Sequence, residues 1–442
     1  MRSAGTLCAL ATTWLLSGCA GYSPLPLEQA PLPTRVEDLD GGRQVPRPPA
    51  LADLTRLALL NNPDLRAVRA QAGVAQAQAL EAGLLPNPAV ALDYALPLGV
   101  QPGAVSAFTA VLSMDLKSLV TFSARRHAAR AAAGSVNAAI LWEEWQTVAR
   151  VQLLAVDLIT GAQQLQLLER SATLLQERLS RTRMAQSSAD VALGEAVPDV
   201  TAAADLKRQV DELERTQQQR ARDLRAVLGL APAAQLPLPE DIELPPVNAA
   251  AVSALLSDLA DRRPDLVALQ LGYASQEQTV RAAVLARFPA LTLGVAYARD
   301  NTGIRSLGPQ AGFDLPLFDR GQGNLAVARA TRLQLRAEFK ARLADARAQV
   351  QGMLDDQVLL ERQRSAQLEQ LETLQAAAVR AQAARAGGDL DERSYLDLIT
   401  ARDAKQQELL ATRQLILEQA VALAALTGAG MPPVTLSNPE AL

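Results

Sequence analysis

The chain has 442 residues, of which 49% are hydrophobic but only 3% are aromatic. A composition rich in Ala and Leu predicts long helices with thin, closely packed interfaces, and it excludes a large core filled by aromatic side chains. The formal net charge of −4 provides no strongly basic surface, so we expect no nucleic-acid partner.

The first residues predict export and lipid attachment. The segment MRSAGTLCALATTWLLSGC has one Arg, a short apolar run and then Leu-Ser-Gly-Cys, and it resembles a bacterial lipoprotein signal. The run is too short for a membrane-spanning helix. We therefore expect a signal peptide at 1–18 and an acyl group such as palmitate on Cys19, with a Pro-rich tether at 19–50. An ordinary secretory signal with an incidental Cys is the alternative. Ala20, rather than Asp, follows the anchor, so we expect retention in the outer membrane.

The rest of the chain repeats itself. Asn62-Pro63-Asp64-Leu65 corresponds to Arg263-Pro264-Asp265-Leu266, and Asp199 corresponds to Asp397. These and other matches keep an offset of about 200 residues, which indicates an internal duplication. A second Pro-rich segment separates the halves. We therefore predict a first repeat at 51–230, a linker at 231–250, a second repeat at 251–430 and a C-terminal tail at 431–442.

Each repeat begins with a helix and continues into two segments in which apolar residues alternate with small or polar ones. This period of two predicts strands near 88–98 and 105–116, and near 289–300 and 305–317. Opposite faces of such strands meet different surroundings. We expect Leu92, Tyr94, Leu293, Tyr297 and Phe313 to face lipid, and Asp93, Asp115, Thr292 and Asp314 to face a water-filled lumen.

Four strands in so helical a chain form either a small sheet covered by helices or part of a membrane barrel. The second interpretation is favoured because five of the six Phe residues lie in or beside the strands, as in an aromatic girdle. No segment after the signal reaches the length of a transmembrane helix, so any insertion must use strands. Since lipid tolerates no open sheet edge, other copies of the chain must close the barrel. Two copies give about eight strands and a filled interior, whereas three give about twelve and leave a passage.

Long helices follow the strands. The segments 124–186 and 322–386 contain no Pro, and at 1.5 Å per residue each spans on the order of 95 Å. Leu and small residues recur at alternating spacings of three and four between Val151 and Leu179, which is typical of coiled-coil packing. The predicted fold class is therefore mainly α, with long coiled-coil helices forming a tunnel and four strands per chain entering a barrel.

These features resemble the outer membrane factors of tripartite efflux systems, the TolC-like proteins. The resemblance rests on the duplication, on Arg263-Pro264-Asp265-Leu266, on DLPLFDRGQGN from Asp314, and on the DLITAR segment from Asp397. The motif LLPNP from Leu84 is similar to the heavy-metal, CzcC-like branch. The resemblance implies a homotrimer with a twelve-stranded barrel and a periplasmic helical tunnel. It also implies a periplasmic adaptor and an inner-membrane pump of the RND type or a related one, which together export metal cations or drugs.

The sequence also suggests where such a tunnel closes. Turns near 187–198 and 386–394 place the start of each returning helix at one end of the bundle. Arg393 lies one helical turn before Asp397, so the two can pair, and the family-like motif favours a periplasmic gate at Asp397, Arg393 and, less strongly, Asp199. A surface pair without a gating role is the alternative.

Other functional classes have weaker support. The single His, His127, lies among Arg residues, where a solvated basic patch is expected rather than a catalytic base. No His and Cys cluster predicts a metal site, so we expect no enzyme activity, cofactor or bound metal. A lipid-anchored periplasmic scaffold or adaptor, and the exit duct of a type I secretion system, are the alternatives.

Overall fold

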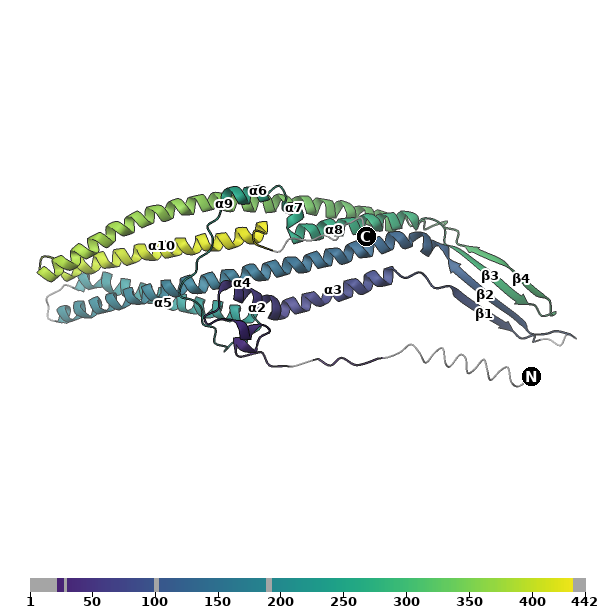
Figure 1. Ribbon diagram of the computed structural model, residues 1–442, viewed down its shortest axis with the longest axis horizontal. Coiled ribbons are helices and arrows are strands. Elements are labelled where there is room, and N and C mark those ends of the chain that lie inside the picture. Colours follow the sequence, from purple (N-terminus) through teal and green to yellow (C-terminus); the bar gives the residue numbers. More distant parts are fainter. Residues whose placement is uncertain (1–21, 28–29, 99–102, 188–192, 432–442) are drawn as a thin grey trace.

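The computed structural model describes residues 22–27, 30–98, 103–187 and 193–431, and shows an elongated body of helices with a small sheet at one end (Figure 1). Two short 3₁₀ turns precede the main elements. The first repeat then follows in the order α2 (Leu51–Asn61), α3 (Pro63–Ala82), β1 (Ala89–Ala95), β2 (Ala107–Asp115), α4 (Leu116–Ser187) and α5 (Leu193–Val227). After the linker come α6 (Ala249–Leu255), α7 (Leu259–Arg262), α8 (Pro264–Leu285), β3 (Leu291–Arg299), β4 (Arg305–Phe313), α9 (Gln322–Gly387) and α10 (Glu392–Thr427).

The helices that precede the strands begin with the same Pro but with different caps. Asn62 accepts a hydrogen bond from the backbone N–H of Leu65 at 2.8 Å, and its amide donates to the Val227 carbonyl at 2.9 Å. It therefore caps α3 and ties it to the end of α5. Arg263 makes no cap bond at the start of α8. It forms a buried ion pair with Asp265 at 2.9 Å, and its guanidinium lies over the Trp142 ring.

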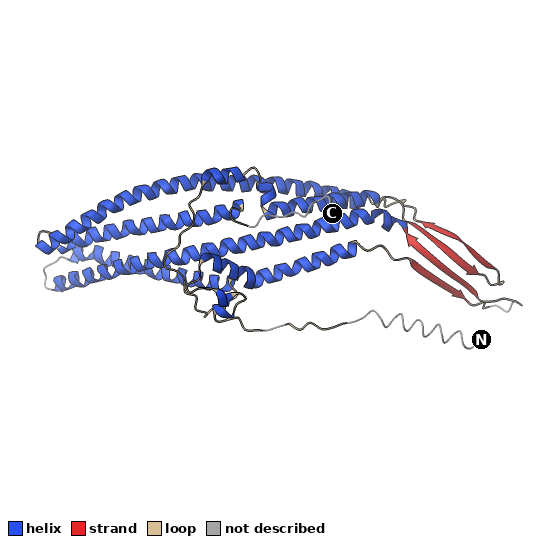
Figure 2. Cartoon of the chain, viewed as in Figure 1, coloured by secondary structure: helices blue, strands red, loops and turns tan. Residues whose placement is uncertain are grey.

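The four strands form one antiparallel sheet in the order β1-β2-β3-β4, drawn in red in Figure 2. Each predicted strand is present, and β4 ends at Phe313 rather than 317. The register pairs Tyr94 with Phe108, Ala110 with Tyr297 and Tyr297 with Leu307. Among the described residues, neither β1 nor β4 has a partner on its outer side.

The long helices leave the sheet in two different ways. Helix α4 starts at Leu116, directly after β2, and so begins eight residues earlier than the sequence predicts. The side chain of Asp115 accepts hydrogen bonds from the Lys117 N–H at 2.9 Å and from the Ser118 hydroxyl at 2.5 Å, which caps the new helix. In the second repeat, a loop separates β4 from α9.

The returning helices α5 and α10 pack against α4 and α9 respectively, and α4 also packs against α3, α8 and α10. The core is accordingly a row of small clusters along the bundle rather than one centre. The largest joins α2, α4 and the end of α5 through Leu54, Leu57, Val151, Leu224 and Leu228. This confirms the predicted fold class of long helices with thin interfaces and a small sheet.

Two expectations need correction. Helix α5 starts at Leu193 with Pro198 inside it, so the turn that precedes it is shorter than the predicted 187–198. Helix α10 is long and apolar enough, by length and composition, to cross a membrane, so the expectation that no segment after the signal reaches this length is wrong. In the structure α10 packs along α9 and α4, and 28% of its most apolar stretch is buried. Cys19, most of the first hairpin turn and residues 432–442 lie outside the described residues.

The dual role of Asn62 gives the first testable prediction. Asn62→Ala removes a buried cap and leaves the Val227 carbonyl without its side-chain donor, so it should destabilise the helical body by about 2 kcal/mol. The thermal unfolding midpoint of the purified protein measures this loss. Asn248 caps the short, exposed helix α6, so Asn248→Ala is the matched control and should shift the midpoint much less. Equal shifts would show that the Val227 contact contributes nothing.

Candidate functional site

The sheet has one apolar face and one face of small and polar residues. The register places all five predicted lipid-facing residues on the same face, and Asp93 and Thr292 lie on the opposite one. The apolar face is uncovered within the chain. Leu92, Tyr94 and Phe313 are 66%, 64% and 66% exposed. Such a continuous exposed apolar surface is characteristic of contact with a membrane or another protein. It belongs to Val90, Leu92, Tyr94, Phe108, Leu112, Met114, Leu293, Val295, Tyr297, Leu307 and Phe313.

The two other acidic residues predicted to face the lumen occupy the ends of the strands. Asp115 is the last residue of β2 and caps α4 through Ser118 and Lys117. Asp314 lies one residue beyond the end of β4, and its N–H donates to the Ala290 carbonyl at 3.0 Å. Both therefore mark the boundary between sheet and helices.

At the other end of the molecule, one arginine joins both repeats. Arg178 of α4 forms an ion pair with Asp199 of α5 at 2.9 Å and a second pair with Asp397 of α10. Arg178 and Asp199 are nearly buried, with side chains 11% and 8% exposed, whereas Asp397 is largely exposed. Thr182 donates a further hydrogen bond to Asp199 at 3.1 Å.

A second ion cluster lies next to this arginine. Glu392, in the first turn of α10, pairs with Arg181 of α4 at 2.7 Å and with Arg385 of α9 at 2.5 Å. The Arg385 guanidinium also lies 4.7 Å from the ring centre of Tyr395. We call Arg178, Asp199, Asp397, Arg181 and Glu392 the tip cluster, because these residues lie toward the end of the bundle farthest from the sheet (Figure 1).

The surroundings of Arg178 in the tip cluster stabilise its charged form. Burial lowers the pKa of Arg178. The hydrogen bonds to Asp397 and Asp199 and the negative charges of these residues raise the pKa by a larger amount, so it lies above the usual value. Arg178 is therefore permanently charged. Removing it would leave the nearly buried Asp199 carboxylate without its ion-pair partner, which is costly.

The structure changes the expected pairing at this end. The helical spacing predicts a pair between Asp397 and Arg393, but the partner of Asp397 is Arg178, and Arg393 forms no ion pair among the described residues. Asp199, which the sequence ranked below Asp397, is the more buried of the two acids. Helical spacing detects neighbours on one helix only, whereas Arg178 reaches Asp397 across 219 positions of sequence. The sequence signal for this contact was that Asp199 and Asp397 occupy equivalent positions in the two repeats.

A pair of carboxyl groups lies nearer the middle of the bundle. The amide of Gln414 donates to Asp157 of α4 at 2.9 Å and to Glu418 of α10 at 2.7 Å. Arg220 of α5 pairs with Asp157 at 3.2 Å. Burial, followed by hydrogen bonding to Asp157, raises the pKa of Glu418 to about 7. Near neutral pH Glu418 is therefore only partly ionised, beside the Asp157 carboxyl group that pairs with Arg220.

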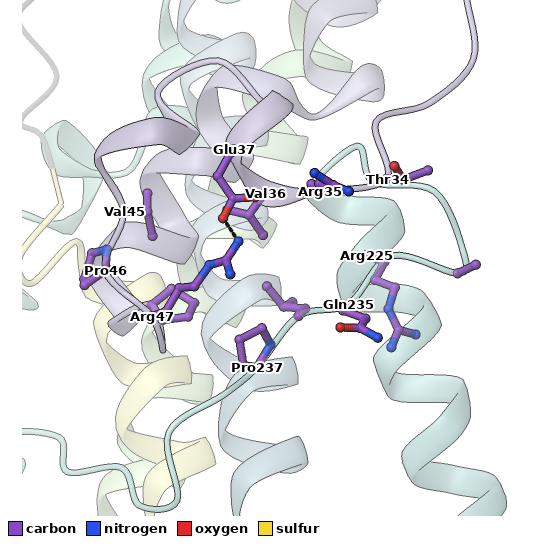
Figure 3. A pocket seen from close by; sticks show the side chains of 13 residues that line it. Thr34, Arg35, Val36, Glu37, Val45, Pro46, Arg47, Arg225, Gln235 and Pro237 are labelled. Atoms are coloured by element: carbon purple, nitrogen blue, oxygen red, sulfur yellow. Dashed lines mark hydrogen bonds and ion pairs between the residues drawn. The ribbon is translucent and has the colours of Figure 1, made fainter.

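The side of the bundle carries a cavity of about 810 Å³ between the N-terminal segment and the linker. Figure 3 shows that Arg47 and Glu37 point toward one another across this cavity, with Arg35, Arg225 and Gln235 around them. No group of three or more His, Cys, Asp or Glu residues that could hold a metal ion occurs in the described part of the chain. The cavity thus offers a polar surface without a recognisable catalytic arrangement.

Comparison with known proteins agrees with this architecture. Residues 255–429 match the family model of outer membrane efflux proteins. No curated protein sequence matches the chain significantly. The fold is similar to that of the outer-membrane channel OprN, with a TM-score of 0.70, 17% identity, and coverage of 86% of this chain and 90% of that chain.

Two further solved structures show the same fold. The first is CusC, whose structures concern folding and transmembrane channel formation. It matches with a TM-score of 0.67 and 18% identity, and the match covers 92% of this chain and 99% of CusC. The open state of the Neisseria gonorrhoeae MtrE outer membrane channel gives 0.67 at 17% identity, with coverage of 88% and 91%. At these identities the likeness establishes the fold.

The carboxyl pair gives a prediction about pH. The folded pKa of Glu418 exceeds its ordinary value of 4.5, so the folded protein holds the proton more tightly than the unfolded chain. The contribution of this group to stability should therefore fall as the pH rises from about 4.5 to about 7, and stay constant above. Glu418→Gln cannot ionise, so this part of the pH dependence should disappear.

Thermal midpoints measured across this pH range test the prediction. Glu408→Gln is the matched control, because Glu408 lies on the same helix, is largely exposed and pairs with Lys405. The thermal midpoint of the control should change with pH as it does in the wild type. If Glu418→Gln and the wild type lose stability in parallel, the proton is not held at this pair.

Proposed function

This chain contains an outer membrane efflux protein domain at residues 255–429 and has the fold of TolC-like channels, and from this we propose that it is the outer membrane duct of a tripartite efflux system. In this proposal the helical body conducts cargo from an inner-membrane pump of the RND type, or a related one, and its periplasmic adaptor. The sheet carries the cargo through the outer membrane. The chain acts by conduction and not by catalysis.

The observation that carries the proposal is the sheet itself. One face presents an uncovered row of large apolar side chains, and the outer edges of β1 and β4 are unpaired within the chain. In hydrocarbon each unsatisfied backbone group costs several kcal/mol, so a spanning sheet must be closed. Pairing of β4 with β1 of another copy satisfies both edges. In a soluble scaffold or adaptor this apolar face would be exposed to water, which is unfavourable.

Three copies suit a conduit better than two. Each copy supplies four strands, so three copies give a barrel of about twelve strands with room for a passage, whereas about eight strands leave an interior filled by side chains. The face that carries Asp93, Thr292 and several Gly residues would then line the lumen. Small side chains on that face leave the passage wide.

The long helices and the anchor complete the proposed path. Helices α4 and α9 have 72 and 66 residues, so each spans on the order of 100 Å, enough to reach far into the periplasm. Acylation at Cys19 would add a second attachment to the outer membrane. An exit duct for type I secretion would share this geometry, but the efflux family match at 255–429 supports efflux cargo.

We place the gate of the tunnel at the tip cluster. Arg178 holds α4, α5 and α10 together through its two ion pairs. A ring of three copies would repeat this clamp around the tunnel mouth, together with three exposed Asp397 carboxylates that attract cations. Opening requires α10 to move away from α4, so the Arg178–Asp397 contact must break while the buried Arg178–Asp199 pair can remain.

Substitutions on the two sheet faces test the barrel. Leu293→Arg places a charge on the apolar face, where it costs about 2 to 4 kcal/mol near the bilayer midplane, so trimer assembly in the outer membrane should fail. Thr292→Arg changes the neighbouring residue on the opposite face. It should assemble and alter single-channel conductance in planar bilayers. Equal tolerance of both changes would exclude a membrane barrel.

Substitutions in the tip cluster test the gate. Arg178→Gln releases Asp199 and Asp397 together, so channels in planar bilayers should open more often and conduct more current. Arg181→Gln removes only the largely exposed contact with Glu392 and should have a smaller effect.

Arg393→Gln is the matched control, because Arg393 forms no ion pair among the described residues. It should behave as the wild type. If Arg393→Gln opens the channel and Arg178→Gln does not, the constriction is held by contacts other than this cluster.

A further inference from the structure

A pocket of about 480 Å³ lies where the second half of the sheet meets the helices. It is bounded by the first turn of α4, the end of α8 and the loop 314–321 between β4 and α9. Three cationic side chains from these three segments line it, namely Lys117, Arg287 and Arg320. The pocket therefore concentrates positive charge at one edge of the sheet.

None of the three cations forms an ion pair among the described residues, although Lys117 lies close enough to Asp115 for an electrostatic interaction. The Arg320 Nε–H makes only a long hydrogen bond of 3.4 Å to the Pro316 carbonyl. The two carboxylates in the lining are Asp314 and Asp319, and Asp319 accepts a hydrogen bond from the Gly321 N–H at 2.8 Å. The lining thus has an excess of one positive charge and free donors for an anion.

Large apolar side chains surround the charged pocket. Phe318 is 93% exposed, and Phe288, Leu315 and Leu317 are also mostly exposed. Leu315, Leu317 and Phe318 follow Phe313, the last residue of β4, which belongs to the apolar face of the sheet, whereas Phe288 follows α8. Charged donors next to uncovered apolar groups match the two parts of a phospholipid, a phosphate and its acyl chains.

The loop that lines the pocket belongs to the second repeat. In the first repeat β2 continues directly into α4, and Asp115 is occupied by its cap bonds to Lys117 and Ser118. The second repeat instead inserts the loop 314–321, which supplies Leu315, Leu317, Phe318 and Arg320 to the pocket. The duplicated architecture does not require this loop, so its composition calls for a separate explanation.

We propose that this pocket binds the headgroup of a membrane glycerophospholipid, with the phosphodiester held by Lys117, Arg287 and Arg320 and the acyl chains lying against Leu315, Leu317 and Phe318. The inference rests on the proposed function, which places the ends of the strands at the inner surface of the outer membrane. The bound lipid fixes the depth of the sheet in the bilayer at three positions in a trimer.

The competing occupant is a second copy of the chain. Pairing of β4 with β1 of a neighbour would bring its loop 83–88, Gly-Leu-Leu-Pro-Asn-Pro, close to this pocket. That loop carries Leu84 and Leu85 but no charged residue, so it would cover the apolar groups and bring no negative charge to the three cations. A phospholipid matches both parts of the site, because its phosphate can pair with the cations and its acyl chains can cover the apolar groups.

Lipid binding to the delipidated, detergent-purified trimer tests the proposal by native mass spectrometry. Phosphatidylethanolamine and phosphatidylglycerol should each bind up to three per trimer, and diacylglycerol with the same acyl chains should not bind. The double substitution Lys117→Gln/Arg287→Gln should weaken phospholipid binding about tenfold or more, because it removes two charged donors. Arg281→Gln, an exposed cation on α8 outside the pocket, is the control and should bind as the wild type.

Binding of diacylglycerol as tight as that of the phospholipids, or unchanged binding by the double variant, would overturn the headgroup site. So would high-yield disulfide cross-linking between copies carrying Leu85→Cys and Leu317→Cys, which would show that the neighbouring loop fills the pocket. Failure of the proposed function has a different signature, since the wild type would then form no SDS-resistant trimer and no conducting channel. A conducting trimer without bound phospholipid contradicts this inference alone.

Discussion

The unpaired edges of the four-stranded sheet are the constraint on which the rest of the molecule depends. Strands β1 and β4 each expose a row of backbone donors and acceptors, and the sheet extends beyond the ends of the helices (Figure 2). Water can satisfy the edges but not the apolar face, and lipid can cover the face but not the edges. The edge-to-edge association of copies that we propose would resolve both demands.

The helical body is stabilised in a different way. Each helix buries only a narrow stripe, and the core breaks into small clusters along the length. Polar contacts supply part of the cohesion between the repeats. Gln164 bonds to Gln414, Ser171 to Asp403, and Arg178 to Asp397. These polar contacts lie along the same seam as a buried apolar cluster that joins α4 and α10 through Val156, Ile159, Leu417 and Val421.

The duplication is close in plan but not in detail. Asn62 caps α3, whereas its counterpart Arg263 forms a buried pair with Asp265 and stacks over Trp142. Strand β2 runs straight into α4, whereas β4 is followed by an apolar loop. A tube built from identical units could have symmetric joints. Here the second repeat carries extra surface beside the sheet, and the first carries the arginine that links both repeats at the far end.

Much of this was readable from the sequence, because the signals are local. Alternation of apolar and small residues fixed the strands and their two faces, since side chains of a strand point alternately to opposite sides. The absence of Pro and the coiled-coil spacing indicated the long helices, and the repeated motifs indicated the duplication. The Asn62 cap is a contact of the same local kind, because its partner Leu65 lies three residues away.

Only the tertiary structure decided which distant groups meet. Arg178 lies 219 positions from Asp397, and Asp157 lies 257 from Gln414, so no spacing along one helix could reveal these contacts. The expected Arg393–Asp397 pair illustrates the limit, because a spacing of four permits a contact on one helix but cannot show that a neighbouring helix offers a better partner. The sequence by itself determined the elements and their faces, through rules that act within a few residues. The packing of the two repeats determined the ion pairs and the raised pKa of Glu418. Both depend on distances between helices that come together only when the chain is folded.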